Sequence, residues 1–133
     1  MRTLVALALL CVVPSSIARG QNGTVACNGD IATVRLSQIK PTSSLPVFMK
    51  AMDAHRAWYR SHGFTNNEIF GARVIVVDAA TKTEKYSDTE ILTFHVRPPV
   101  VGKPDAAWDA YVRQYRDSAD IQNEYRVCMP KNR

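Results

Sequence analysis

The chain has 133 residues, of which 46% are hydrophobic and 22% charged, and its formal net charge is +5. The positive charges form neither a run nor a basic tail, so the composition argues against nucleic-acid binding. No segment reaches the ~20 consecutive apolar residues that a membrane-spanning helix requires.

The N-terminal residues have the composition of a secretory signal peptide. Arg2 is followed by the apolar run Leu4–Val13 and then by small residues, which is the order of segments in such leaders. Small residues precede two candidate cleavage points, after Ala18 and after Gly20, and we favour the second. We therefore expect residues 1–20 to be removed, leaving a secreted or periplasmic protein with no membrane attachment.

The expected mature chain, residues 21–133, is long enough for one domain with its own core. Its net charge falls to +3, because two arginines leave with the leader. Cys11 leaves as well, so Cys27 and Cys128 remain, one near each end. An even pair in an oxidising compartment predicts a disulfide, with two unpaired thiols as the alternative. We predict no metal site, because two isolated cysteines lack the paired spacing of zinc ligands.

The first half of the mature chain predicts a strand followed by a helix. Residues Ile31–Ile39 alternate in polarity and are rich in β-branched side chains, which is typical of a strand. Ser43 or Ser44 can cap the helix that follows, which we expect to continue to about His62. Gly63 supplies the left-handed residue that commonly ends a helix.

The second half predicts two strands, a helix and a last strand. We expect strands at 67–79 and 89–97, a polar turn at 80–88 between them, a helix at 106–119 capped by Asp105, and a strand at 123–129. The order β-α-β-β-α-β predicts an α+β, ferredoxin-like fold with an antiparallel sheet in the order 4-1-3-2. In this order the last strand lies antiparallel to the first, which brings Cys27 close to Cys128.

Strand alternation divides the predicted sheet into two faces of different polarity. The apolar set is Val34, Leu36, Leu92, Phe94, Val96, Tyr125, Val127 and Met129, and the other set is Thr33, Arg35, Ser37, Ile91, Thr93, His95, Arg97 and Arg126. We expect the helices to cover the apolar set. The segment Val74–Val77 is apolar on both faces although its strand is an edge in this order, and the simplest cover for it is a second copy of the chain.

With this element order and a first helix that ends in "AHRAWYRSHGF" (residues 54–64), the chain resembles the dimeric α/β-barrel superfamily. Its members include small monooxygenases, haem-degrading enzymes and stress-responsive proteins. The resemblance implies a homodimer in which two ferredoxin-like sheets pack face to face, and a ligand held between the first helix and the sheet. It points to an exported branch of the superfamily, from which no catalytic motif carries over.

The histidines of the first helix allow three interpretations. His55 and His62 are separated by ~10 Å along the helix, too far to share a metal ion. In the first interpretation both form hydrogen bonds at the margin of the apolar stripe, with Trp58 covering the boundary with solvent. In the second they line a pocket in which Tyr59 and His62 face His95, with His62 nearest the ligand. In the third, one histidine binds haem.

The sequence therefore supports two classes of function. The first is an exported binding or structural domain that holds a small apolar or aromatic molecule, with no cofactor. The alternative is an oxidoreductase of the small-monooxygenase or haem-linked type. A cavity of several hundred Å³ lined by His55, Tyr59 and His62 would favour the enzyme, and a filled core would favour the binding or structural domain. The sequence identifies neither a substrate nor a reaction.

Overall fold

The computed structural model describes residues 25–131, and the predicted signal peptide lies outside this range. The elements are β1 (Gly29–Ile39), α1 (Leu45–Ser61), β2 (Glu68–Val77), β3 (Glu84–Val96), α2 (Ala106–Ser118) and β4 (Ala119–Pro130). The predicted α+β element order is therefore confirmed. Between residues 25 and 131, neither helix is long and apolar enough to cross a membrane.

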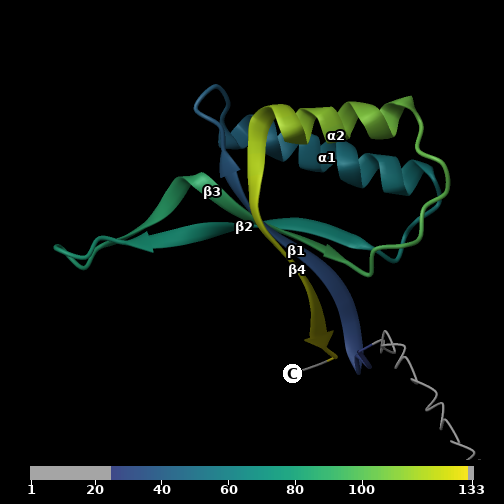
Figure 1. The fold of residues 1–133 in the computed structure, drawn as a ribbon, viewed down its shortest axis with the longest axis horizontal. Helices are drawn as coiled ribbons and strands as arrows, with labels where there is room; N and C mark the ends of the chain where they lie inside the picture. The colour runs from purple at the N-terminus through teal and green to yellow at the C-terminus, as the bar shows by residue number, and fades with distance from the viewer. Residues whose placement is uncertain (1–24, 132–133) are drawn as a thin grey trace, which may run out of the picture.

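The strands form one antiparallel sheet in the order β2-β3-β1-β4, which reads 4-1-3-2 from the β4 edge. Strand β1 is internal and pairs with β3 on one side and β4 on the other. Figure 1 shows the two helices side by side on one face of this sheet. The hairpin formed by β2 and β3 projects beyond the region that the helices cover.

Two predicted strand starts are wrong by four or five residues. Strand β3 begins at Glu84, so residues 84–88 belong to the strand rather than to the turn. These residues are mostly exposed, because they lie in the projecting hairpin, and their polarity therefore resembles that of a loop. Strand β4 begins at Ala119, directly after α2, where residue 123 was expected. Its side chains are mostly exposed as well, so its first residues carry no apolar alternation.

The predicted helix ends are confirmed, although one cap works differently. Gly63 has a φ of 82° and follows α1. Its N–H donates to the Arg60 carbonyl, and the N–H of Phe64 donates to the Tyr59 carbonyl at 3.0 Å. This pair of bonds is a Schellman motif, with the rings of Tyr59 and Phe64 in contact. At the other end Ser44 occupies the cap position, but its side chain forms no capping bond.

The expectation that the helices cover the apolar face of the sheet is wrong. Thr33, Arg35 and Ser37 of β1 line a cavity beneath the helices. A side chain at Gly71 would contact Ile91 and Met52, which places Ile91 on the helix side too. Alternation separates the two faces correctly, but it does not say which of them the helices cover.

The face turned away from the helices therefore carries the apolar set. Phe70, Phe94, Val34 and Tyr125 lie opposite one another in register and form a row across all four strands. The rings of Phe70 and Phe94 stack with centroids 4.9 Å apart. Phe70 and Tyr125 remain 38% and 55% exposed. We call these four residues the open-face row.

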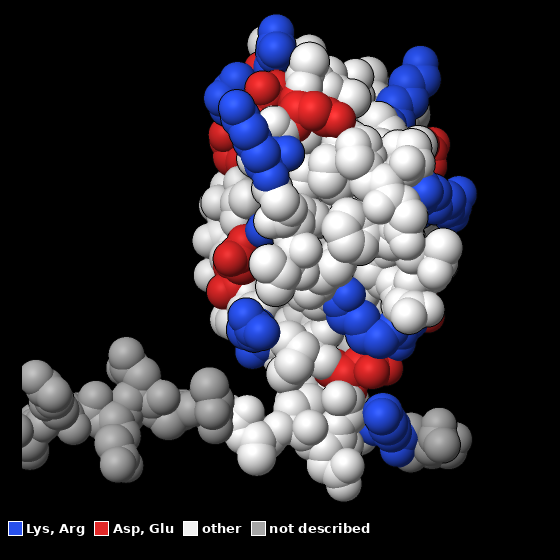
Figure 2. Space-filling model, turned by 90° about the vertical axis from the view of Figure 1, so that its right-hand side faces the viewer, with Lys and Arg blue, Asp and Glu red and all other residues white. Residues whose placement is uncertain are grey.

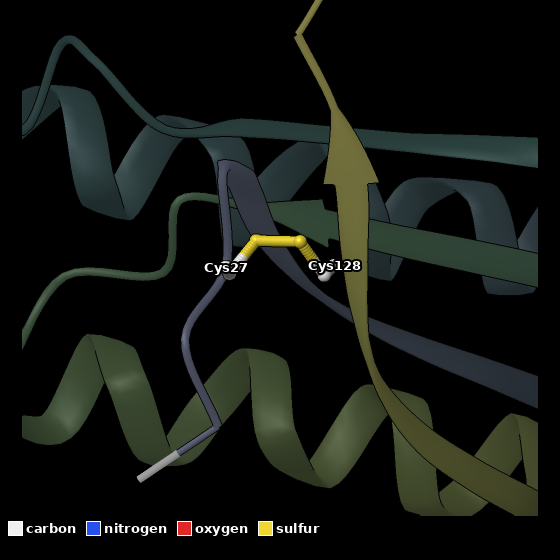
Figure 3. The surroundings of a disulfide bond; sticks show 2 residues. All are labelled: Cys27 and Cys128. Atoms are coloured by element: carbon white, nitrogen blue, oxygen red, sulfur yellow. A yellow bond between two sulfur atoms is a disulfide. The ribbon is translucent and has the colours of Figure 1, made fainter.

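The predicted disulfide between Cys27 and Cys128 is confirmed, with Cα atoms 5.6 Å apart. Figure 3 shows it joining the segment before β1 to the end of β4. The bond is possible because Ile31 pairs with Cys128 in the antiparallel register. It ties the two chain ends of the sheet together across a sequence separation of 101 residues.

Replacing both cysteines by serine should lower the free energy of unfolding by up to ~4–5 kcal/mol, because the unfolded chain then regains the entropy that the long loop removes. Urea unfolding of the mature protein under non-reducing conditions measures the difference. Two alkylatable thiols in the native exported protein, seen by intact mass, would contradict the disulfide.

Candidate functional site

A cavity of about 480 Å³ lies between the helices and the sheet. Its sheet side is mainly polar and its helix side is largely aromatic. The lining residues are Thr33, Arg35, Ser37, Phe48, His55, Tyr59, Ile69, Thr93, Phe94, His95, Trp108, Tyr111, Val112, Tyr115, Arg116, Ala119, Asp120 and Ile121. Every helix and strand of the domain thus contributes at least one lining residue.

Two buried histidines and a tyrosine form the centre of the site. His55 on α1 and His95 on β3 are 8% and 9% exposed, and their ring centroids are 5.3 Å apart. Tyr59, one turn beyond His55, has its ring 5.0 Å from that of His95. The Nδ2 group of Asn67 donates a hydrogen bond to His95 Nε2 at 3.1 Å. The structure therefore brings together three of the predicted site residues, His55, Tyr59 and His95.

Helix α2 adds two tyrosines that the sequence analysis did not assign to the site. The Tyr111 ring stacks on His55 at 4.6 Å, and the Tyr115 hydroxyl lies 3.3 Å from His55 Nδ1. The Tyr111 hydroxyl is buried and has no hydrogen-bond partner within residues 25–131. A buried hydroxyl without a partner is unfavourable, so Tyr111 has a donor to offer to a molecule that enters the cavity.

Both cavity histidines are neutral near pH 7. The pKa of His55 falls to about 3, first because burial disfavours the charged ring and then because His95, Arg35 and Arg56 are close. The pKa of His95 falls to about 4 through burial and the charge of Arg35. Burial also raises the pKa values of Tyr59, Tyr111 and Tyr115. The site is therefore an aromatic pocket whose neutral imidazoles and hydroxyls can form hydrogen bonds.

His62 and Trp58 lie outside the cavity lining, so the prediction that His62 faces His95 is wrong. The His62 ring stacks on Trp58 at 4.0 Å, and its Nε2 is 3.0 Å from Asp105 Oδ2. Trp58 is only 6% exposed, so it does not cover the boundary with solvent as the first interpretation expected. Its indole Nε1 donates a hydrogen bond to Asp105 Oδ1 at 2.8 Å. Figure 2 views the end of the molecule where α1 ends and α2 begins, with charged side chains around an uncharged centre.

The group formed by Trp58, His62 and Asp105 has a structural role that explains its position. Asp105 also accepts the N–H of Trp108 and so caps α2, as predicted. These hydrogen bonds, first that from the Trp108 backbone and then that from Trp58, lower the pKa of Asp105. The carboxylate thereby joins the end of α1 to the beginning of α2 and holds the two helices above the sheet. We call this group the helix clamp.

No group of three or more His, Cys, Asp and Glu residues within the described part of the chain could hold a metal ion. Comparisons with protein-family models, with curated proteins and with solved structures found no match to this chain. Any assignment of function therefore depends on the chemistry of the cavity.

The buried histidines should make the protein less stable in acid. Between about pH 6.5 and pH 3 the unfolded chain holds a proton on His55 that the folded chain excludes, so the free energy of unfolding should fall as the pH falls through this window. Replacing His55 by Gln should reduce this pH dependence, and urea unfolding at several pH values measures it.

The matched control is His62→Gln, which changes an exposed histidine in the helix clamp. This variant should keep the acid sensitivity of the parent chain. Equal loss of acid sensitivity in both variants, or in neither, would contradict the burial of His55 as its cause.

Proposed function

We propose that the protein is an exported domain that binds a small aromatic molecule in the cavity between α1, α2 and the sheet. The cavity itself carries the proposal, because about 480 Å³ lies within the range of small-molecule sites and the lining combines six aromatic side chains with several polar groups. The unpartnered Tyr111 hydroxyl and the neutral His55 and His95 supply hydrogen-bonding groups for such a ligand.

Export is supported by two independent features. The leader at residues 1–20 has the composition of a signal peptide. Cys27 and Cys128 form a disulfide, and disulfides persist in oxidising compartments. A secreted or periplasmic location agrees with both.

The ferredoxin-like assignment and the dimer are part of the proposal. The strand order and the placement of both helices on one face support the ferredoxin-like fold. The open-face row supports association, because a sheet face with exposed Phe70 and Tyr125 is an apolar surface that water covers poorly. We propose that a second copy of the chain covers it, since the same row on both partners makes a two-fold interface self-complementary.

An oxidoreductase of the small-monooxygenase type is the second candidate. Two of the three residues expected to line an enzyme's cavity, His55 and Tyr59, do line it, and this favours the oxidoreductase. The third, His62, does not line the cavity. The neutral His55 imidazole can accept a hydrogen bond from the hydroxyl of a bound phenol, although its lowered pKa makes it a weak base. Oxygen consumption with a panel of phenols and hydroquinones tests this candidate, and a turnover lost in His55→Gln would support it. The haem-linked variant predicts a Soret band on titration with haemin.

Filling the cavity should weaken ligand binding. Val112 lines the cavity on α2 and is 38% exposed, so Val112→Trp can place an indole in the space without burying a new charge. We expect the affinity for naphthalene-sized aromatic compounds to fall at least about tenfold. Titration calorimetry measures the affinity.

Val47→Trp is the control. Val47 is also a helical valine, 47% exposed, but it does not line the cavity. It should bind as the parent chain does. Equal binding by the two variants, or no binding of any aromatic compound by the parent, would contradict the proposed site.

The dimer has its own test. Phe70→Lys places a charge at the β2 end of the open-face row and should yield a monomer, because an unpaired charge would be buried in the interface. Sedimentation velocity at a protein concentration of roughly tens of micromolar measures the oligomeric state. Val47→Lys should remain dimeric, and a monomeric parent chain would contradict the dimer.

A further inference from the structure

Arg35 is a cation on the floor of the cavity. It lies on β1, an internal strand of the sheet, and its side chain is 38% exposed. Its Nε donates to Glu124 Oε2 at 2.5 Å, and Glu124 is itself 52% exposed on β4. This partner engages only the Nε edge of the guanidinium. The two terminal nitrogens therefore retain donors for a second acceptor.

The charge of Arg35 reaches all the ionisable rings of the site. It lowers the pKa values of His55 and His95, and it counteracts the rise that burial causes in Tyr59, Tyr111 and Tyr115. These effects place Arg35 at the electrostatic centre of the cavity. Burial remains the larger influence on each ring.

The ion pair with Glu124 offsets the charge of Arg35 in part, and the other charges near the cavity leave a positive surplus. Arg116 lines the cavity and adds a second positive charge. Asp120 is the lining carboxylate, and Lys40 Nζ lies 3.3 Å from it. Asp53 and Asp105 act on the site only from a distance, through Tyr115 and Tyr111. The interior is therefore complementary to a negative group.

We infer that the natural ligand is an aromatic acid, whose ring lies against the aromatic side chains of α1 and α2 and whose carboxylate binds the Arg35 guanidinium. The inference rests on the proposed function, because it names the class of ligand that the same cavity takes. A guanidinium binds a carboxylate through parallel N–H···O bonds, which a lysine cannot imitate. Thr33 and Thr93 lie on the same polar floor and can donate to the second carboxylate oxygen.

Matched pairs of acid and amide test the inference on the mature, disulfide-bonded protein. Benzoate with benzamide, 1-naphthoate with 1-naphthamide, and indole-3-acetate with indole-3-acetamide vary the ring while keeping its shape within each pair. Calorimetry should show that the acid of at least one pair binds ten or more times as tightly as its amide. Arg35→Gln should remove this preference and leave the affinity for the amide unchanged.

Two further variants separate recognition from general charge effects. Arg126→Gln removes a positive charge from exposed β4 outside the cavity lining, and it should keep the preference for the acid. Glu124→Gln frees the Arg35 edge that Glu124 now occupies, and it should strengthen binding of the acid. A circular-dichroism melt of each variant verifies folding.

The outcomes distinguish the inference from the function on which it rests. Equal affinities for acid and amide, or an acid preference that persists in folded Arg35→Gln, would overturn the inference and leave the cavity as a binding site. The same loss in Arg126→Gln as in Arg35→Gln would overturn it too, because net charge alone would then explain the preference. Failure of every acid and every amide to bind would overturn the proposed function together with the inference.

Discussion

The structure depends on the packing of His55 between the two helices and the sheet. The imidazole stacks on Tyr111 of α2 and meets His95 of β3 edge to face, so one side chain of α1 contacts both the other helix and the sheet. This contact is favourable only while the ring is neutral, because a charged imidazole would lose its water without a counter-ion. The neutrality of His55 is thus a condition for the arrangement of the domain and for the chemistry of its cavity.

The cavity results from the residues that face each other between the helices and the sheet. Thr33, Arg35 and Ser37 give the sheet a polar surface under the helices, and the aromatic rings of the helices face it across the cavity. The helix clamp, in which Trp58 and His62 both reach Asp105, supports the far end of the helix pair. The space between the layers is therefore maintained by contacts at its margin and is open to a ligand at its centre.

Much of the fold could be predicted from the sequence, because local signals determine it. Gly63 and Asp105 mark helix ends by their own conformational and hydrogen-bonding preferences, and the element order brings Cys27 beside Cys128. The site was predicted in part. His55, Tyr59 and His95 meet, whereas His62 belongs to the helix clamp, because a partner 43 residues away determines its position. Arg35 was assigned to the open face, since alternation cannot say which face a helix layer covers.

The three histidines of the chain allow a direct test of the central claim, that the cavity between the helices and the sheet is a binding site. Imidazole resonances can be followed by NMR during titration with 1-naphthoate and 1-naphthamide. The account predicts that the resonances of His55 and His95 shift together and saturate with at least one of these compounds, while those of His62 remain in place. Shifts confined to His62, or no shift of His55 and His95 with either compound, would contradict it.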